Sequence, residues 1–321
     1  MIAEDLTGDD LGDVLELNSG ASAWWVLPRD DDYGAAELRE VAHALDLDEL
    51  AIKDLLANDR RAKFEAIGQA RLVITNAVFL DPERAEVTVH PVSIIVTDRV
   101  LICLVDSSRT FQPAQLLLSR ESTLATGGVE AALQLVVGAV INTYESVVSW
   151  LESSTDDLAN IMFEERPLDK PEQLHAFKLR TALSQLRRLT DPMRAVMTDL
   201  VDSPPPPTKG KAGRGTTASR RWTLLAEQHH RVANAADALR EALSSLFDTS
   251  LALADVRMNQ TMKKLSGWAA IIAVPTLVTS FVGMNVGFPL TGTATGFWVY
   301  LTIMVAAGVL LYFAFRRRDW I

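Results

Sequence analysis

The feature that most constrains this chain is a stretch of 51 residues, Leu265 to Phe315, that contains no Asp, Glu, Lys or Arg. Within it, the apolar runs 265–281 and 297–315 have 17 and 19 residues. A helix needs roughly 20 apolar residues to cross a hydrocarbon core. Because an uncharged connection of 15 residues, 282–296, joins the two runs, we expect a transmembrane hairpin over residues 265–321.

The charges beside the two runs predict the orientation of the hairpin. Lys263 and Lys264 precede the first run, and Arg316, Arg317 and Arg318 follow the second. Under the positive-inside rule both flanks are cytoplasmic, so the connection faces outside. We therefore expect a multi-pass protein of the cell (inner or plasma) membrane with cytoplasmic N- and C-termini.

The remaining chain predicts an acidic cytoplasmic part. The formal net charge is −10, of which −12 falls on residues 1–264, and such an acidic body argues against nucleic acid as a partner. Four short runs rich in β-branched and aromatic residues predict strands at 21–28, 70–80, 85–96 and 99–106. With a helical pattern over 35–59, they predict a mixed α/β domain over residues 1–126. No nucleotide-binding or catalytic motif occurs, so we expect no enzyme.

Residues 127–264 are predicted to form long helices and a stalk. Pro192 is expected to kink or interrupt the second helix, and the Pro- and Gly-rich residues 204–219 are expected to form a mobile linker. A third helix is expected to begin near Arg221 and to continue into the membrane. Its apolar side chains recur every seven residues, which indicates packing against other helices: Leu225, Val232, Leu239, Leu246 and Leu253.

One face of this third helix carries almost no large apolar side chain, although large apolar residues occupy the neighbouring faces. Steps of four and three residues give Asp248, Ala252, Asp255, Asn259, Met262, Ser266, Ala269, Ala273, Thr276 and Ser280. We call these ten residues the polar stripe. Close helix packing is one explanation, and a water-filled pathway is the other.

The acidic and amide groups of the polar stripe favour the pathway, since close packing needs neither. A single hairpin cannot enclose a pathway in lipid, so this interpretation requires a symmetric homo-oligomer. Acidic side chains along the axis would make the pathway cation-selective.

Several short motifs together resemble the CorA family of divalent-cation transporters. They are "NQTMKKL" at 259–265, Pro275-Thr276 inside the first apolar run, "GMN" at 283–285, and the tail "RRRDWI". The resemblance implies a homopentamer with a funnel-shaped cytoplasmic domain and stalk helices that line the pore. It also implies an external ring of motif asparagines that meets a hydrated Mg2+.

By position, the resemblance makes Asn285 the selectivity residue, with Gly283 and Met284 shaping the turn. Asp248, Asn259 and Thr276 would face the pore. Met262 and Leu265 would form a hydrophobic constriction. Mg2+ would be the transported ion rather than a cofactor, with Zn2+, Co2+ and Ni2+ as alternatives.

The chain departs from the magnesium-type pattern in two respects. The residue before the motif is Val282 rather than an aromatic, and the connection has no carboxylate, as in the ZntB-like zinc branch. A Zn2+ transporter, perhaps proton-coupled, is therefore one alternative, and a membrane-anchored oligomeric scaffold or sensor is another.

The second departure concerns regulation. Leu224 occupies a position where the family has a regulatory acid. Glu227, Asp156 and Asp157 are the candidate regulatory metal ligands. His229 and His230, beside Glu227, are an alternative pair for a softer metal.

Overall fold

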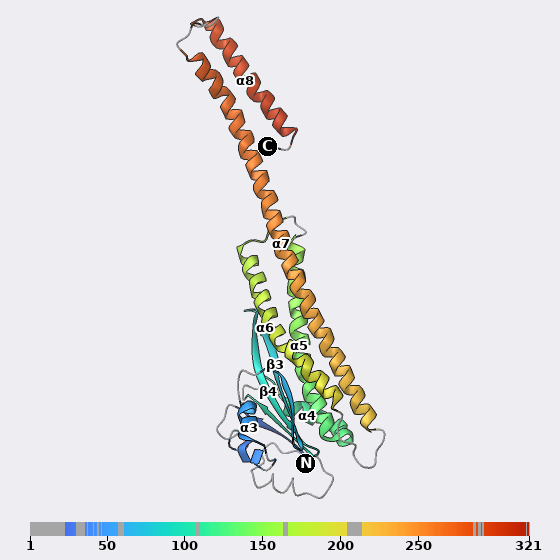
Figure 1. Ribbon diagram of the computed structural model, residues 1–321. Helices are drawn as coiled ribbons and strands as arrows, with labels where there is room; N and C mark the ends of the chain where they lie inside the picture. The colour runs from blue at the N-terminus through green and yellow to red at the C-terminus, as the bar shows by residue number, and fades with distance from the viewer. Residues whose placement is uncertain are drawn as a thin grey trace. The chain divides into compact units, whose positions relative to one another are not determined.

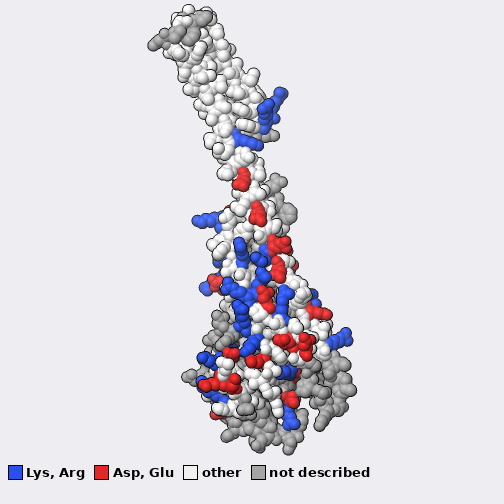
Figure 2. All heavy atoms as spheres, viewed as in Figure 1, with Lys and Arg blue, Asp and Glu red and all other residues white. Residues whose placement is uncertain are grey.

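The computed structural model describes residues 23–318 and 320, except 30–35, 37, 41, 44, 46, 57–60, 107–109, 163–165, 204–213, 285, 286, 288, 289 and 291. The chain divides into two compact units. Unit 1 comprises residues 1–160 and 169–245, and unit 2 comprises 161–168 and 246–321. Charged side chains cover much of unit 1, whereas the hairpin of unit 2 is almost free of them (Figure 2).

Unit 1 contains a mixed five-stranded sheet in the order β1-β5-β4-β3-β2 (Figure 1). The strands are β1 (Ala23–Pro28), β2 (Lys63–Ile67), β3 (Ala70–Asp81), β4 (Glu86–Val96) and β5 (Val100–Val105). Only β1 and β5 pair in parallel, and the other pairs are antiparallel. The four predicted strands are confirmed, and β2 is an additional strand.

Helices cover both faces of this sheet. One face packs against α3 (Glu49–Leu56) through residues such as Leu55, Ile95 and Ile102. The other face lies against α5 (Glu121–Met162) and α6 (Lys170–Asp202), which hydrogen-bond to β3. All six residues of β5 are buried, as expected for a central strand that is covered on both faces.

The packing of α5 compensates for the short length of β2. The pairing of β2 with β3 covers only residues 70–74 of β3, so the next residues of β3 lack a strand neighbour on that side. Tyr144 on α5 donates its hydroxyl hydrogen to the Asn76 carbonyl at 2.7 Å. Thr143 Oγ1 accepts a hydrogen bond from the Val78 N–H at 3.0 Å. The α5 side chains thus satisfy backbone groups that would otherwise be buried without partners.

Helix α5 agrees with the long helices expected from about residue 127, whereas α6 departs from the interruption expected at Pro192. Gly128 has φ 62° and ψ −151° inside α5, a conformation open to glycine, so the regular long helix starts just after it. Helix α6 runs through Pro192 without interruption. Asp169 and Glu172 form a capping box at its start, which satisfies backbone N–H groups of the first turn.

Three described helices are long and apolar enough to span a membrane: α5, α7 (Arg214–Val282) and α8 (Ala294–Arg316). In the most apolar 18-residue stretch of each helix, half of the residues of α5 are buried within the protein, whereas 6% are buried in α7 and 0% in α8. The apolar side chains of α5 therefore belong to the protein core. The exposed windows of α7 and α8 match the two predicted spans.

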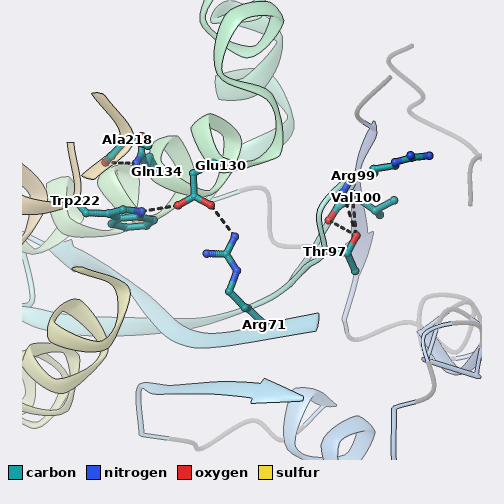
Figure 3. A network of polar contacts seen from close by, with 8 residues as sticks. All are labelled: Arg71, Thr97, Arg99, Val100, Glu130, Gln134, Ala218 and Trp222. Carbon is teal, nitrogen blue, oxygen red and sulfur yellow. Dashed lines mark hydrogen bonds and ion pairs between the residues drawn. The ribbon is translucent and has the colours of Figure 1, made fainter. Parts of the chain in front are cut away.

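The start of α7 is held in unit 1 by a polar network (Figure 3). The Glu130 carboxylate of α5 accepts hydrogen bonds from Trp222 Nε1 and from Arg71 Nη2 of β3, each at 2.6 Å. Gln134 donates to the Ala218 carbonyl at 2.9 Å. Helix α7 begins at Arg214, and not near Arg221 as the sequence predicted. Residues 204–213 of the expected linker lie outside the described residues, and residues 214–219 are helical.

The division into units also differs from the three domains expected from the sequence. The sheet and the long helices share unit 1, because α5, α6 and the start of α7 complete its core. The boundary on α7 falls at Leu246, upstream of the expected boundary at residue 264.

Unit 2 contains α8, which runs antiparallel to the last part of α7 (Figure 1). Thr293 caps α8, since its Oγ1 accepts a hydrogen bond from the Gly296 N–H at 3.2 Å and donates to the Leu290 carbonyl at 2.8 Å. A Cβ at position 296 would lie 2.1 Å from the Leu290 carbonyl oxygen. Gly296 therefore permits the close approach that joins the connection to the first turn of α8.

His229 is a buried titratable residue where α7 packs against α5 and α6 in unit 1. Its ring lies edge-on to Tyr144, with centroids 6.4 Å apart, and bonds to the Thr190 backbone. No described group bonds to its Nε2. Burial, followed by the positive charge of Arg194, lowers the pKa of His229 from 6.5 to about 4.

This environment predicts that unit 1 loses stability in mild acid. The pKa of His229 is lower in the folded than in the unfolded state. The stability that its burial in the neutral form contributes is therefore fully present above about pH 6.5 and is lost as the pH falls toward 4. At pH 5 the loss is about 2 kcal/mol. Unfolding midpoints of the full chain in detergent, compared at pH 7.5 and 5.0, measure it. His229→Gln is expected to abolish this loss of stability at pH 5.0. The same substitution at the exposed neighbour, His230→Gln, is expected to leave it in place. An unchanged pH dependence in His229→Gln would contradict the role given to His229.

Candidate functional site

All ten residues of the polar stripe belong to unit 2 and are exposed in the single chain. On the same helix, Gly267 is buried, and Ile271, Val274, Val278 and Val282 are partly buried. A pocket of about 430 Å³ lies between Val278 and Val282 on α7 and Phe297 and Leu301 on α8. At about 100° per residue, the membrane part of the stripe lies about 160° from this covered face. Helix α8 therefore packs on α7 and leaves the polar stripe open.

A second element of unit 2 covers α7 at the level of Asp248. Ser250 is 6% exposed, and its Oγ accepts a hydrogen bond from the Leu168 N–H of the α5–α6 connection at 3.1 Å. Two residues of helix separate Ser250 from Asp248 by about 200°, which places them on nearly opposite sides. Asp248 is thus left exposed. The sequence did not identify Ser250, because nothing local reveals its distant partner.

Large apolar side chains flank the polar stripe on α7. Leu251, Met258, Leu265 and Ile272 recur every seven residues, and each is more than 60% exposed. Leu265 and Ile272 lie in the apolar span, where lipid can cover them. Leu251 and Met258 precede Lys263, so water would contact them in a single chain, and exposed apolar rows of this kind mark contact surfaces. The sequence analysis expected large apolar residues on the faces beside the stripe, and the seven-residue spacing of these four residues agrees with it.

The two residues of the expected hydrophobic constriction occupy different positions around α7. Met262 lies in the polar stripe, whereas Leu265 lies about 60° away on the apolar flank. Both side chains are exposed, by 56% and 63%. The constriction stays a prediction, with Met262 better placed than Leu265 to reach a pathway along the stripe.

The first two residues of the Gly-Met-Asn motif continue the end of α7. The Gly283 N–H donates to the Thr279 carbonyl at 2.9 Å, and the Met284 N–H donates to the Phe281 carbonyl at 3.3 Å. Both residues are exposed. Asn285 lies outside the described residues, so its assigned role stays a prediction.

The candidate regulatory acids lie on different helices. Glu227 is exposed on α7, and Asp156 and Asp157 are exposed on α5. The residue after Glu227, Gln228, contacts α5 at Asn142 and Glu145, and Asp156 is eleven residues further along, or about 16 Å. The described part of the chain holds no group of three or more His, Cys, Asp or Glu that could bind a metal.

The adjacent histidines also face different surroundings. His229 is buried against Tyr144. His230 is exposed and lies 3.4 Å from Arg194 Nη1 and 3.0 Å from Asn234 Nδ2. The two rings therefore do not form a shared metal site in the single chain.

Two comparisons with solved structures match this architecture. A CorA magnesium transporter from Methanocaldococcus jannaschii superposes with a TM-score of 0.75 at 21% identity, over 93% of this chain and 91% of that one. The ZntB cytoplasmic domain from Vibrio parahaemolyticus superposes with a TM-score of 0.54 at 12% identity, over 72% and 87% of the two chains. At these identities the likeness is one of fold.

Comparisons of the sequence find similarity both over a short segment and over most of the chain. The cobalt/magnesium transport protein CorA of Methanocaldococcus jannaschii is 40% identical over 83 residues, which is 26% of this chain and 26% of that protein. The family model described as "CorA-like Mg2+ transporter protein" matches residues 22–317. This protein therefore belongs to the CorA family of membrane transporters.

Proposed function

We propose that this protein forms a homopentameric pathway for hydrated divalent metal cations across the cell membrane, with Mg2+ as the main ion. The observation that carries the proposal is the polar stripe, which stays uncovered on α7 while α8 and the α5–α6 connection cover the opposite side. The small and polar side chains of the stripe suit contact with water or with other helices better than contact with lipid. Several copies of α7 arranged around an axis would enclose it.

The apolar flank supports assembly through α7 itself. Leu251 and Met258 stay exposed in the single chain, and their seven-residue spacing suits packing against the same helix of a neighbouring copy. Such a contact would remove these side chains from water and turn the polar stripe toward the axis.

The chemistry of the stripe suits a hydrated cation. Mg2+ gives up its waters reluctantly, so neutral oxygens that hydrogen-bond to those waters can recognise the ion and still release it. Asn285 outside, and Thr276 and Asn259 along the stripe, carry such oxygens. Asp248 and Asp255 would raise the local cation concentration, and Met262 would narrow the pathway.

Zn2+ is the second candidate ion. The connection 282–296 has no carboxylate, so cation recognition there would rest on Asn285 and backbone oxygens. Regulation by Glu227, Asp156 and Asp157 would require ligands from more than one copy, because Asp156 lies about 16 Å along α5 from the level of Glu227.

Ion flux into vesicles tests the proposal. We expect purified protein to carry Mg2+ into vesicles loaded with a Mg2+-sensitive dye, faster than Zn2+ measured with a Zn2+-sensitive dye. Faster Zn2+ flux would select the second candidate ion. Absence of flux for every divalent cation would leave only a scaffold or sensor.

Asn285→Ala tests the external recognition site. We expect it to abolish flux while the oligomer keeps its size in light scattering, because only the group that meets the hydrated ion is lost. Thr291→Ala, a polar truncation in the same connection, is the matched control and should keep flux. Full flux in Asn285→Ala would remove the role assigned to this residue.

Asp248→Asn tests the polar stripe directly. The substitution keeps the side-chain shape and removes one charge from each copy. We expect flux at low ion concentration to fall at least about fivefold, since a charge 4 Å from a monovalent ion in water contributes about 1 kcal/mol. Glu152→Gln, an exposed acid on α5, is the charge-matched control. Equal flux in the two variants would argue against Asp248 facing the pathway.

A further inference from the structure

Five cationic side chains gather at one end of the hairpin of unit 2. Lys263 and Lys264 lie on α7, and Arg316, Arg317 and Arg318 end α8; all five are exposed. Counted from the connection, Lys264 lies 18 residues before the end of α7 and Arg316 lies 22 residues after the start of α8. At about 1.5 Å per residue these positions lie at similar depths. Figure 2 shows cations at this end of an otherwise uncharged hairpin.

No described carboxylate neutralises this cluster. None of the five cations forms an ion pair with a described acid, and Asp319 lies outside the described residues. The nearest described acid before it on α7, Asp255, is eight residues from Lys263, or about 12 Å along the helix. Screening reduces interactions between exposed charges beyond about 8 Å at physiological salt. The cluster therefore presents a strongly positive surface.

The tail holds this surface at the edge of the apolar segment. The Trp320 N–H donates to the Phe315 carbonyl at 3.0 Å, and the two rings stack with centroids 5.5 Å apart and planes 13° apart. The chain thus turns back after Arg318 and keeps the arginines around the end of α8. Tryptophan prefers the level of the lipid headgroups.

We infer that the surface formed by Lys263, Lys264 and Arg316–Arg318 binds the headgroups of anionic phospholipids. The cations border the apolar residues directly, so phosphate groups of the bilayer lie at their level. Clusters of four to eight basic residues beside a span bind anionic lipid, with about 1 kcal/mol from each residue. A soluble anion would share the charge complementarity but would not be fixed at this depth.

The surface also bears on ion flux, a consequence that rests on the proposed function. In an oligomer, the clusters of all copies would surround the cytoplasmic end of the pathway and repel cations. Bound anionic headgroups would neutralise them. Divalent-cation flux should therefore rise when phosphatidylglycerol is added to phosphatidylcholine vesicles.

Lipid retention tests the inference without transport. Full-length protein is reconstituted in vesicles of equal phosphatidylglycerol and phosphatidylcholine, extracted in mild detergent, and its bound lipids are quantified by mass spectrometry. We expect enrichment of phosphatidylglycerol that falls roughly thirtyfold in Arg317→Gln/Arg318→Gln, since each of the two lost charges contributes about 1 kcal/mol. Equal retention of both lipids by the unmodified protein would overturn the inference.

Two controls separate charge from misfolding. Arg317→Lys/Arg318→Lys keeps the charge and should keep the enrichment. Arg220→Gln/Arg221→Gln removes two exposed charges at the start of α7 and should not change it. If this control pair loses as much enrichment as Arg317→Gln/Arg318→Gln, the assigned surface is wrong. Enrichment without flux in any vesicle would contradict the proposed function and leave the lipid surface standing.

Discussion

The polar stripe of α7 is the constraint on which the arrangement of unit 2 depends. Its acids and Asn259 precede the apolar span, and its membrane part carries only Ser, Thr and Ala, so apart from Met262 the stripe lacks the large apolar side chains of the neighbouring faces along its whole length. Helix α8 packs on the opposite side of α7, and the Leu168–Ser250 hydrogen bond places the α5–α6 connection on that side as well. Both contacts leave the same face open along the whole stripe. We propose that other copies of α7 cover this open face, since its exposed apolar flank suits such a contact.

Unit 1 anchors the first part of the same helix by satisfying polar groups. Tyr144 and Thr143 bond to the backbone of β3 where it has no strand neighbour on the β2 side. Glu130 joins β3, α5 and the start of α7 through Arg71 and Trp222. Buried hydrogen bonds to charged groups contribute about 1.5 to 3 kcal/mol each. Helix α7 passes from unit 1 into unit 2, so the helix that contains His229 also carries the polar stripe.

Charge is distributed along the chain in a way that suits both proposed ligands. The acids of the stripe, Asp248 and Asp255, belong to α7 before its apolar span. The cations gather at the boundary of the span, where the acids of the stripe are too distant to neutralise them. In the proposed lipid contact, anionic headgroups would provide the missing negative charge, and the resulting neutral boundary would let the acids attract cations to the pathway.

The sequence by itself determined the elements with local signals: the two apolar helices, four of five strands, the heptad of α7 and the polar stripe. Periodicity and composition specify these, because they depend on neighbouring residues. Only the tertiary structure revealed β2, whose "KFEAI" is short and has two charged residues among five, and the start of α7 at Arg214. It alone separated buried His229 from exposed His230, and found Ser250. The surroundings of His229 and Ser250 depend on partners more than thirty residues away in sequence, such as Leu168 for Ser250, which no local pattern encodes. Strand β2 forms by pairing with the neighbouring β3 despite its weak local signal.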